Sequence, residues 1–251
     1  MMAFTIAGRE LRTMFLSPLA WSILGVIQII LAWMFLVQMD YYLMVQARIA
    51  GMDEAPGITD LIVVPLFGNA GVILLLVTPL LTMRLISEER RNRTLSLLFT
   101  APVSMTDIIL GKYLGVLGFL LVMVGMIALM PLSLLFGGGL DLGRFAACIM
   151  ALVLLLGGFA AVGLFISALA SQPTVAAIST FGALLGLWII DWSGNDSGHA
   201  GGVMEYVSLL RHYESLLKGL VSTTDLAYFA LFILAFLVLS VHALDNERLQ
   251  K

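Results

Sequence analysis

Long apolar stretches alternate with short polar segments along the whole of this 251-residue chain. A helix needs about 20 apolar residues to cross the hydrocarbon core of a bilayer. The apolar stretches also lack the strict polar and apolar alternation of a half-buried strand. We therefore expect an all-α polytopic membrane protein, with a single transmembrane domain that covers residues 1–251. Six spans are predicted, at residues 19–39, 61–83, 113–136, 145–169, 175–192 and 226–244.

The composition agrees with this pattern and excludes an ordinary soluble domain. Hydrophobic residues make up 61% of the chain and charged residues 12%, whereas soluble domains contain about 45–50% apolar and about 25% charged residues. The net charge of −3 is too small to indicate a nucleic-acid partner. Cys148 is the only cysteine, so no disulfide can form within the chain.

The positions of the basic residues predict how the chain is oriented in the membrane. If both termini lie on one side, that side receives nine of the 13 lysines and arginines and the other side receives four. The positive-inside rule then places both termini in the cytoplasm. The polar segment 84–107 lies on the cytoplasmic side, and the segment 193–225 forms an external loop. A bacterial inner (plasma) membrane is the expected location.

Residues 84–93, RLISEERRNR, carry six charges between two apolar stretches. Each buried charge costs about 2.5–3.5 kcal/mol at the centre of a bilayer, so this segment must lie outside it. The charges either anchor the loop by the positive-inside rule or form a surface that binds a protein partner. Anchoring needs only basic residues, and the presence of Glu88 and Glu89 favours the second interpretation.

The segment that follows the charges predicts two helix starts. Leu95, Leu98 and Phe99 fall at positions i, i+3 and i+4, which indicates a short amphipathic helix with Asn92 as its N-cap. Pro102 ends that helix. Ser104 and Asp107 then have the spacing of a capping box, which marks the start of the next helix.

This loop resembles the cytoplasmic loop of type 2 ABC exporter permeases. The matching residues are Glu88, Glu89, Arg93-Thr94-Leu95, Leu97-Leu98, Ala101-Pro102-Val103-Ser104, Asp107-Ile108 and Gly111-Lys112. The resemblance implies six spans, cytoplasmic termini, an N-terminal interfacial "elbow" helix at residues 1–18 and a coupling helix between the second and third spans. It also implies a separate cytoplasmic ATPase subunit, which would bind ATP and Mg²⁺. The residues implied at the ATPase interface are Glu88, Glu89, Arg90, Arg91, Arg93, Thr94, Leu95, Leu98 and Phe99.

The external segment 208–219 further resembles the gliding-motility-associated permease subfamily. Apolar residues recur every three or four positions around it, which predicts an amphipathic helix on the outer surface with His212 on or near its polar face. This helix either plugs the exit of a pathway or returns the chain to the membrane. The external loops are either solvated or contacts for an extracytoplasmic auxiliary protein.

Small residues spaced four apart predict close helix packing within the spans. Gly111 and Gly115 form one such pair, and Gly182 and Gly186 form another. Each pair serves either packing within the chain or a dimer seam, since permeases of the resembled family work in pairs. The second subunit is either an identical copy or a homologue.

The spans lack the ionisable residues that drive ion-coupled transport. Lys112 lies near a predicted span end, where its side chain can reach the interface. No P-loop and no H-E-x-x-H motif occurs, so we expect no catalytic residues, no cofactor and no metal in this chain. Its energy would come from the ATPase, and the chain would be an exporter permease. The alternative is a mechanotransmitter that relays ATP hydrolysis to an extracytoplasmic partner without moving a substrate.

Overall fold

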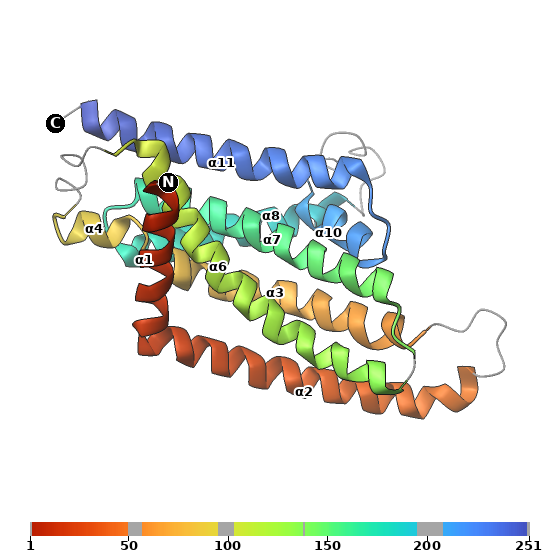
Figure 1. Ribbon diagram of the computed structural model, residues 1–251. Helices are drawn as coiled ribbons and strands as arrows, with labels where there is room; N and C mark the ends of the chain where they lie inside the picture. The colour runs from red at the N-terminus through yellow and green to blue at the C-terminus, as the bar shows by residue number, and fades with distance from the viewer. Residues whose placement is uncertain (1, 50–56, 95–102, 138, 195–207, 250–251) are drawn as a thin grey trace.

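The computed structural model describes residues 2–49, 57–94, 103–137, 139–194 and 208–249, which are almost entirely helical and contain no strand (Figure 1). In chain order the elements are α1 (Met2–Leu16), α2 (Pro18–Ile49), η1 (Thr59–Val63), α3 (Val64–Thr82), α4 (Ser87–Arg91), α6 (Met105–Leu132), η2 (Ser133–Gly137), α7 (Leu142–Leu169), α8 (Pro173–Gly194), α10 (Leu209–Leu217) and α11 (Thr223–Leu249).

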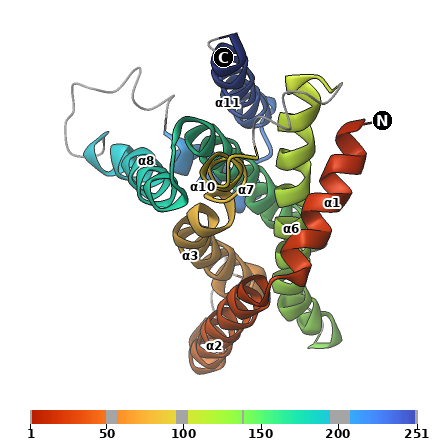
Figure 2. The ribbon, with the colours of Figure 1, turned by 90° about the vertical axis from the view of Figure 1, so that its left-hand side faces the viewer.

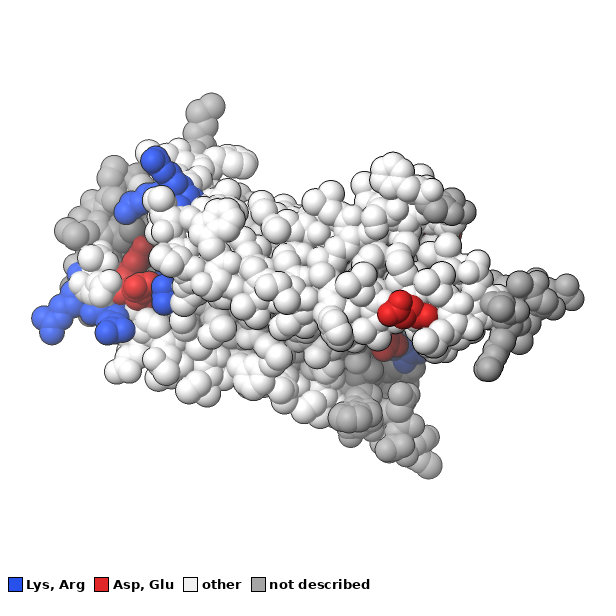
Figure 3. Space-filling view, turned by 90° about the horizontal axis from the view of Figure 1, so that it is seen from below, with Lys and Arg blue, Asp and Glu red and all other residues white. Residues whose placement is uncertain are grey.

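Five helical stretches in the described residues are long and apolar enough to cross a membrane. They are Pro18–Gln46, Thr59–Arg91, Met105–Phe136, Leu142–Leu169 and Thr223–Arg248. Helix α8 contributes a shorter apolar stretch, Pro173–Ile189. On the face shown in Figure 3, charged side chains gather at the two ends of the molecule and leave an uncharged band between them. This distribution is that of a multi-pass membrane protein.

Helix α7 lies at the centre of the bundle, where α3, α6, α8, α10 and α11 pack around it (Figure 2). Glycine lets one of these neighbours come very close. A Cβ atom on Gly163 would lie only 2.2 Å from Oγ1 of Thr82, in α3. Thr82 is fully buried, and its hydroxyl donates to the carbonyl of Thr78. At this crossing the missing side chain of Gly163 therefore lets the backbone of α7 come close to α3.

Helices α1 and α4 lie at the same end of the bundle as the start of α6 and the ends of α7 and α11 (Figure 1, left). We call this the α4 end. Helix α1 turns sharply into α2 at Pro18, whose fixed φ suits the first position of a helix. The indole Nε1 of Trp21 donates to the carbonyl of Phe15 at 2.8 Å and fastens this corner.

Candidate functional site at the α4 end

The five residues Ser87–Arg91 form α4, and the order of their charges suits a helix. Glu88 and Glu89 lie in the first turn, and Arg90 and Arg91 lie in the last turn. Both pairs therefore interact favourably with the helix dipole. A helix of this length is unstable on its own in water, so its neighbours must hold it in place.

Helix α4 ends in a Schellman turn. The Arg93 N–H donates to the carbonyl of Arg90 at 3.1 Å, and the Thr94 N–H donates to the carbonyl of Glu89 at 2.9 Å. Arg93 has a φ of 58°, in the left-handed region where glycine is usual at this position. The turn therefore places backbone strain on Arg93, which has a side chain where a glycine would be unstrained.

The structure corrects one detail of the loop. Asn92, expected to begin a helix, is instead the C-cap of α4. The expectation was wrong because the charged segment before it is itself helical. The short helix predicted around Leu95, Leu98 and Phe99 lies outside the described residues.

The turn before α4 is held by Ser167, which is fully buried near the end of α7. Its Oγ accepts hydrogen bonds from the N–H groups of Ile86 and Ser87, at 3.1 and 3.2 Å. The same hydroxyl donates to the carbonyl of Met83 at 3.2 Å. The Ser167 side chain thus provides hydrogen-bond partners for backbone N–H and C=O groups in the turn between α3 and α4.

The guanidinium of Arg90 ties α4 to the ends of two long helices. Its Nη1 donates to the carbonyls of Leu169 and Ala170 at 2.9 and 3.1 Å, and its Nη2 donates to the carbonyl of Ala168 at 2.7 Å. It also forms an ion pair with Glu247 of α11. A cation at the C-terminus of α7 is favoured by the dipole of that helix. Arg90, expected to face an ATPase subunit, is therefore engaged within the chain.

Lys112 links three helices through one buried ammonium group. It belongs to α6, is 3% exposed, and its Nζ lies 2.7 Å from Oε1 of Glu10 in α1 and 2.8 Å from Oε1 of Glu89 in α4. The second oxygen of Glu89 is buried without a hydrogen-bond partner among the described residues. Sequence reasoning gave Lys112 an interfacial position and missed this cluster, because Glu10 lies 102 positions away.

Two of the four glycines predicted to mediate helix packing lie where α6 contacts α1. A Cβ atom on Gly111 would lie 2.6 Å from the side chain of Ile6 and 2.9 Å from the carbonyl oxygen of Ala3. A Cβ atom on Gly115 would lie 2.7 Å from Cβ of Glu10. These glycines therefore serve packing within the chain, and they bring Glu10 close enough to pair with the lysine of α6.

Gly182 and Gly186, in α8, lie in open space. A Cβ atom added to either glycine would have no atom of the described chain within 4 Å. The part of the chain that the structure describes therefore leaves the small-residue face of α8 uncovered.

Ser104 is the N-cap of α6, as predicted, but the Asp107 carboxylate bonds to its hydroxyl and not to its backbone N–H. The Asp107 N–H donates to Oγ of Ser104 at 3.1 Å, and the Ser104 hydroxyl donates to Oδ2 of Asp107 at 2.7 Å. This reciprocal pair caps the helix that carries the buried lysine.

The remaining polar residues of this segment point outward. Glu88, Arg91, Arg93 and Thr94 are exposed. The charges of the segment thus divide into an inner pair, Glu89 and Arg90, which bind other helices, and an outer set on the surface. Of the charges that the structure describes here, the outer set is better placed to contact another chain directly.

The opposite end of the bundle is closed by α10, which packs against α3, α7, α8 and α11. The Tyr213 hydroxyl donates to the carbonyl of Phe67 at 2.6 Å, and burial raises the pKa of this phenol well above its usual value. His212, expected on or near a polar outer face, is instead buried, with Nδ1 2.6 Å from Oδ1 of Asp225. Asp225 also accepts from the Ser215 hydroxyl at 3.1 Å. These contacts fasten α10 to the start of α11.

The described residues include no group of three or more His, Cys, Asp and Glu side chains that could hold a metal ion. What the α4 end offers is a mechanical connection, because one short charged helix is bonded to α6, α7 and α11 and, through Lys112, to α1. A force applied to α4 would reach α6, α7 and α11 directly and α1 through Lys112.

Comparison with known families identifies the chain. A family model described as ABC-2 family transporter protein matches residues 38–191, which is more than half of the sequence. No curated protein matches the chain. The matched region includes α4, the turn that precedes it, and the lysine that binds it.

Proposed function

The chain belongs to the ABC-2 transporter family, and we propose that it is the membrane-spanning permease subunit of an ATP-binding cassette exporter. A separate cytoplasmic ATPase subunit, which binds ATP and Mg²⁺, energises it through residues 84–107. The observation that supports this proposal is the set of bonds that joins α4 to α1, α6, α7 and α11. A surface element with these connections can pass an external push to the helices that cross the membrane.

We divide the expected interface by what each side chain does. Glu88, Arg91, Arg93 and Thr94 contact the ATPase, because they are exposed. Glu89 and Arg90 position α4 by binding other helices. The predicted coupling helix, with Leu95, Leu98 and Phe99, continues the interface beyond α4.

The proposed topology has six spans, with α8 as the fifth of them. Both termini and the α4 end lie in the cytoplasm, α1 is the interfacial elbow helix, and α10 lies at the external end, in a bacterial inner membrane. The nine-to-four distribution of basic residues supports this orientation, as does the gathering of lysine and arginine side chains at the α4 end on the face shown in Figure 3. A cysteine placed at Arg91 would then react with a membrane-impermeant reagent only after the cell membrane has been opened.

The permease is proposed to work as a pair, with a second copy or a homologue. The open glycine face of α8 favours this helix as the contact surface, because glycines let two helices approach closely. Membership of the gliding-motility-associated subfamily, and with it an extracytoplasmic auxiliary protein, is a further part of this proposal. It rests on the resemblance of residues 208–219.

A mechanotransmitter that moves no substrate is the second candidate. Helix α7 touches both ends of the molecule, since its last carbonyls bind Arg90 and the thiol of Cys148 lies 3.6 Å from the carbonyl of Leu217 in α10. Movement of α4 would therefore reach the external helix. Transport in reconstituted vesicles, measured beside capture of an external partner, separates the two candidates: an exporter moves a substrate and a mechanotransmitter does not.

The central proposal is tested by purifying the tagged chain in mild detergent from its native membrane. We expect a P-loop ATPase chain to co-purify with it, and the double charge reversal Glu88→Lys with Arg91→Glu to abolish that association. Arg12→Glu is the matched control, because Arg12 is an exposed cation of α1 outside the α4 segment. Unchanged association in the double variant would disprove the assignment of this surface.

A further inference from the structure

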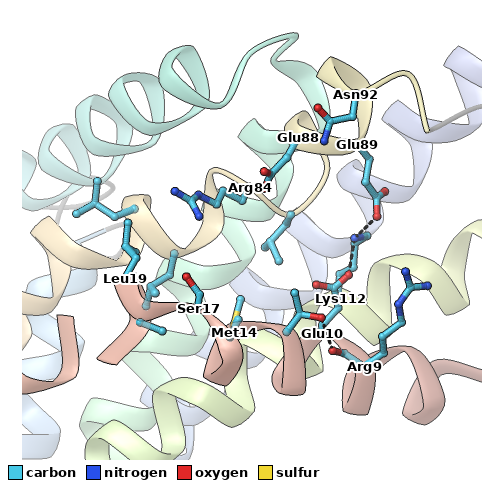
Figure 4. Close-up of a pocket in the computed structure, with 15 residues that line it drawn as sticks. Arg9, Glu10, Met14, Ser17, Leu19, Arg84, Glu88, Glu89, Asn92 and Lys112 are labelled. Carbon is cyan, nitrogen blue, oxygen red and sulfur yellow. Dashed lines mark hydrogen bonds and ion pairs between the residues drawn. The ribbon is translucent and has the colours of Figure 1, made fainter. Parts of the chain in front are cut away.

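A cavity of about 350 Å³ opens at the α4 end, between α1, the start of α2, the end of α3 and α4 (Figure 4). Its walls combine aliphatic side chains with charged ones. The lining residues that carry the argument are Leu19, Leu80, Leu81, Arg84, Glu89 and Lys112.

The charged and apolar groups occupy different parts of this cavity. In Figure 4, Glu89 and Lys112 lie at one end, Leu19 lies at the other end, and Arg84 lies between them. The apolar end is formed where α2 begins and α3 ends, so it lies at the edge of the hydrocarbon layer. Arg9, Glu10 and Glu88 also line the cavity, so its charged part offers both carboxylates and cations, and its aliphatic part lies beyond Arg84.

Two of the charged groups have unused bonding capacity. Arg84 is exposed and takes part in no ion pair within the described residues. The Oε2 atom of Glu89 is buried without a hydrogen-bond partner there, while the other oxygen of this carboxylate is occupied by Lys112. A buried carboxylate oxygen without a partner is costly. Protein atoms enclose this oxygen, so a donor in the cavity reaches it when the Glu89 carboxylate turns toward the cavity, and the new hydrogen bond would stabilise that donor.

We propose that this cavity binds a membrane phospholipid whose headgroup ends in a primary ammonium, as in phosphatidylethanolamine. The phosphate binds Arg84, since basic side chains between membrane helices commonly hold lipid headgroups. The ammonium donates to Oε2 of Glu89, and one acyl chain lies along Leu19, Leu80 and Leu81. The order of groups in the cavity matches the order of ammonium, phosphate and acyl chain in that lipid.

This chemistry separates phosphatidylethanolamine from the two other common headgroup types. Choline carries a cation but has no N–H to donate to Glu89, and its methyl groups enlarge the headgroup. Phosphatidylglycerol offers the phosphate to Arg84, but its headgroup hydroxyls are neutral donors and bind the Glu89 carboxylate more weakly than an ammonium does. The site therefore selects by the N–H donors of the headgroup and not by net charge alone. The proposal depends only on the membrane location of the chain and not on its ATPase partner.

Native mass spectrometry of the purified chain in detergent tests this proposal. Phosphatidylethanolamine, phosphatidylcholine and phosphatidylglycerol with identical acyl chains are added in turn, and the retained lipid is counted. We expect about tenfold more retention of phosphatidylethanolamine than of phosphatidylcholine, as befits one hydrogen bond to a charged group. Equal retention of these two lipids would overturn the proposal and show binding of bulk lipid only.

Two substitutions test the two headgroup contacts. Arg84→Gln lowers retention of all three lipids, because it removes the phosphate contact and affects an exposed side chain that does not support the fold. Glu89→Gln lowers phosphatidylethanolamine to the level of phosphatidylcholine, and Arg12→Gln, outside the cavity, changes nothing. Wild-type retention in Arg84→Gln would overturn the proposal even if Glu89→Gln fails to fold.

Discussion

Lys112 and Glu89 form an ion pair with 2.8 Å between Nζ and Oε1, and the same ammonium lies 2.7 Å from Glu10. A single buried cation therefore holds a carboxylate from α1 and one from α4 against α6. Without the cation, the two carboxylates would face each other at the edge of the membrane. The cluster makes the position of α4 dependent on α1, although the two helices are far apart in the sequence.

Removing this cation should destabilise the protein strongly. We expect Lys112→Met to lower the free energy of unfolding by about 3 kcal/mol, because the loss of one partner from a buried ion pair leaves uncompensated charge. Unfolding in detergent, followed by circular dichroism, measures the change. Arg12→Met, at an exposed site of α1, should stay within about 0.5 kcal/mol of wild type. Equal losses in the two variants would mean that the cluster contributes nothing to stability.

Arg90 should depend on the shape of its side chain as well as on its charge. Arg90→Lys keeps the charge near Glu247, but a lysine cannot reproduce the fork of donors that binds three carbonyls. We expect a loss of about 2 kcal/mol for Arg90→Lys and less than about 1 kcal/mol for Glu247→Gln, since that pair is partly exposed. The same unfolding measurement ranks the two variants, and the reverse order would contradict this account.

Arg93 offers a test of backbone strain that separates backbone from side chain. Arg93→Gly and Arg93→Ala remove the same charge, but only glycine adopts a positive φ without strain. We therefore expect the glycine variant to be more stable than the alanine variant by about 1 kcal/mol. Indistinguishable unfolding curves for the two proteins would mean that the turn is not under strain.

The packing of α1 on α6 can be tested with a pair of glycines from one helix. Gly111→Ala places a methyl group 2.9 Å from a backbone oxygen of α1, whereas a Cβ atom on Gly125 would meet no atom of the described residues within 4 Å. The first substitution should cost about 1–3 kcal/mol by overpacking, and Gly125→Ala should be neutral or stabilising by up to about 1 kcal/mol. A cost that is the same at both sites would indicate only a general intolerance of α6 to alanine.

The open glycine face of α8 predicts an effect on association without an effect on folding. Gly182→Leu adds a side chain where none of the described residues places an atom within 4 Å of the new Cβ. The proposed pairing through α8 predicts a smaller dimer fraction in detergent, measured by light scattering, with an unchanged unfolding midpoint. A dimer fraction equal to that of wild type would place the contact surface elsewhere.

Local patterns in the sequence predicted the helices well. Each of the six apolar stretches lies in a helical part of the structure, and the Ser104 cap lies at the start of α6. The helix ends were less predictable. Helix α2 runs to Ile49, ten residues past the predicted span, because hydrophobicity reports the thickness of the hydrocarbon layer and not the end of the helix.

The contacts of the site could not be predicted, because they join residues that are distant in the sequence. No local pattern relates Lys112 to Glu10, or Arg90 to Glu247. The residue type alone suggested that both cations face outward, as most do. His212 was misjudged for the same reason, since only the fold brings Asp225 to it and allows a histidine to be buried there.

The ion pair between Arg90 and Glu247 joins residues 157 positions apart, which has a consequence for biosynthesis. Helix α11 is synthesised after α4, α6 and α7, so it meets an α4 that Ser167 of α7 and Lys112 of α6 already hold. Among the bonds to α4 described above, the pair with Glu247 is therefore the last that a growing chain can form.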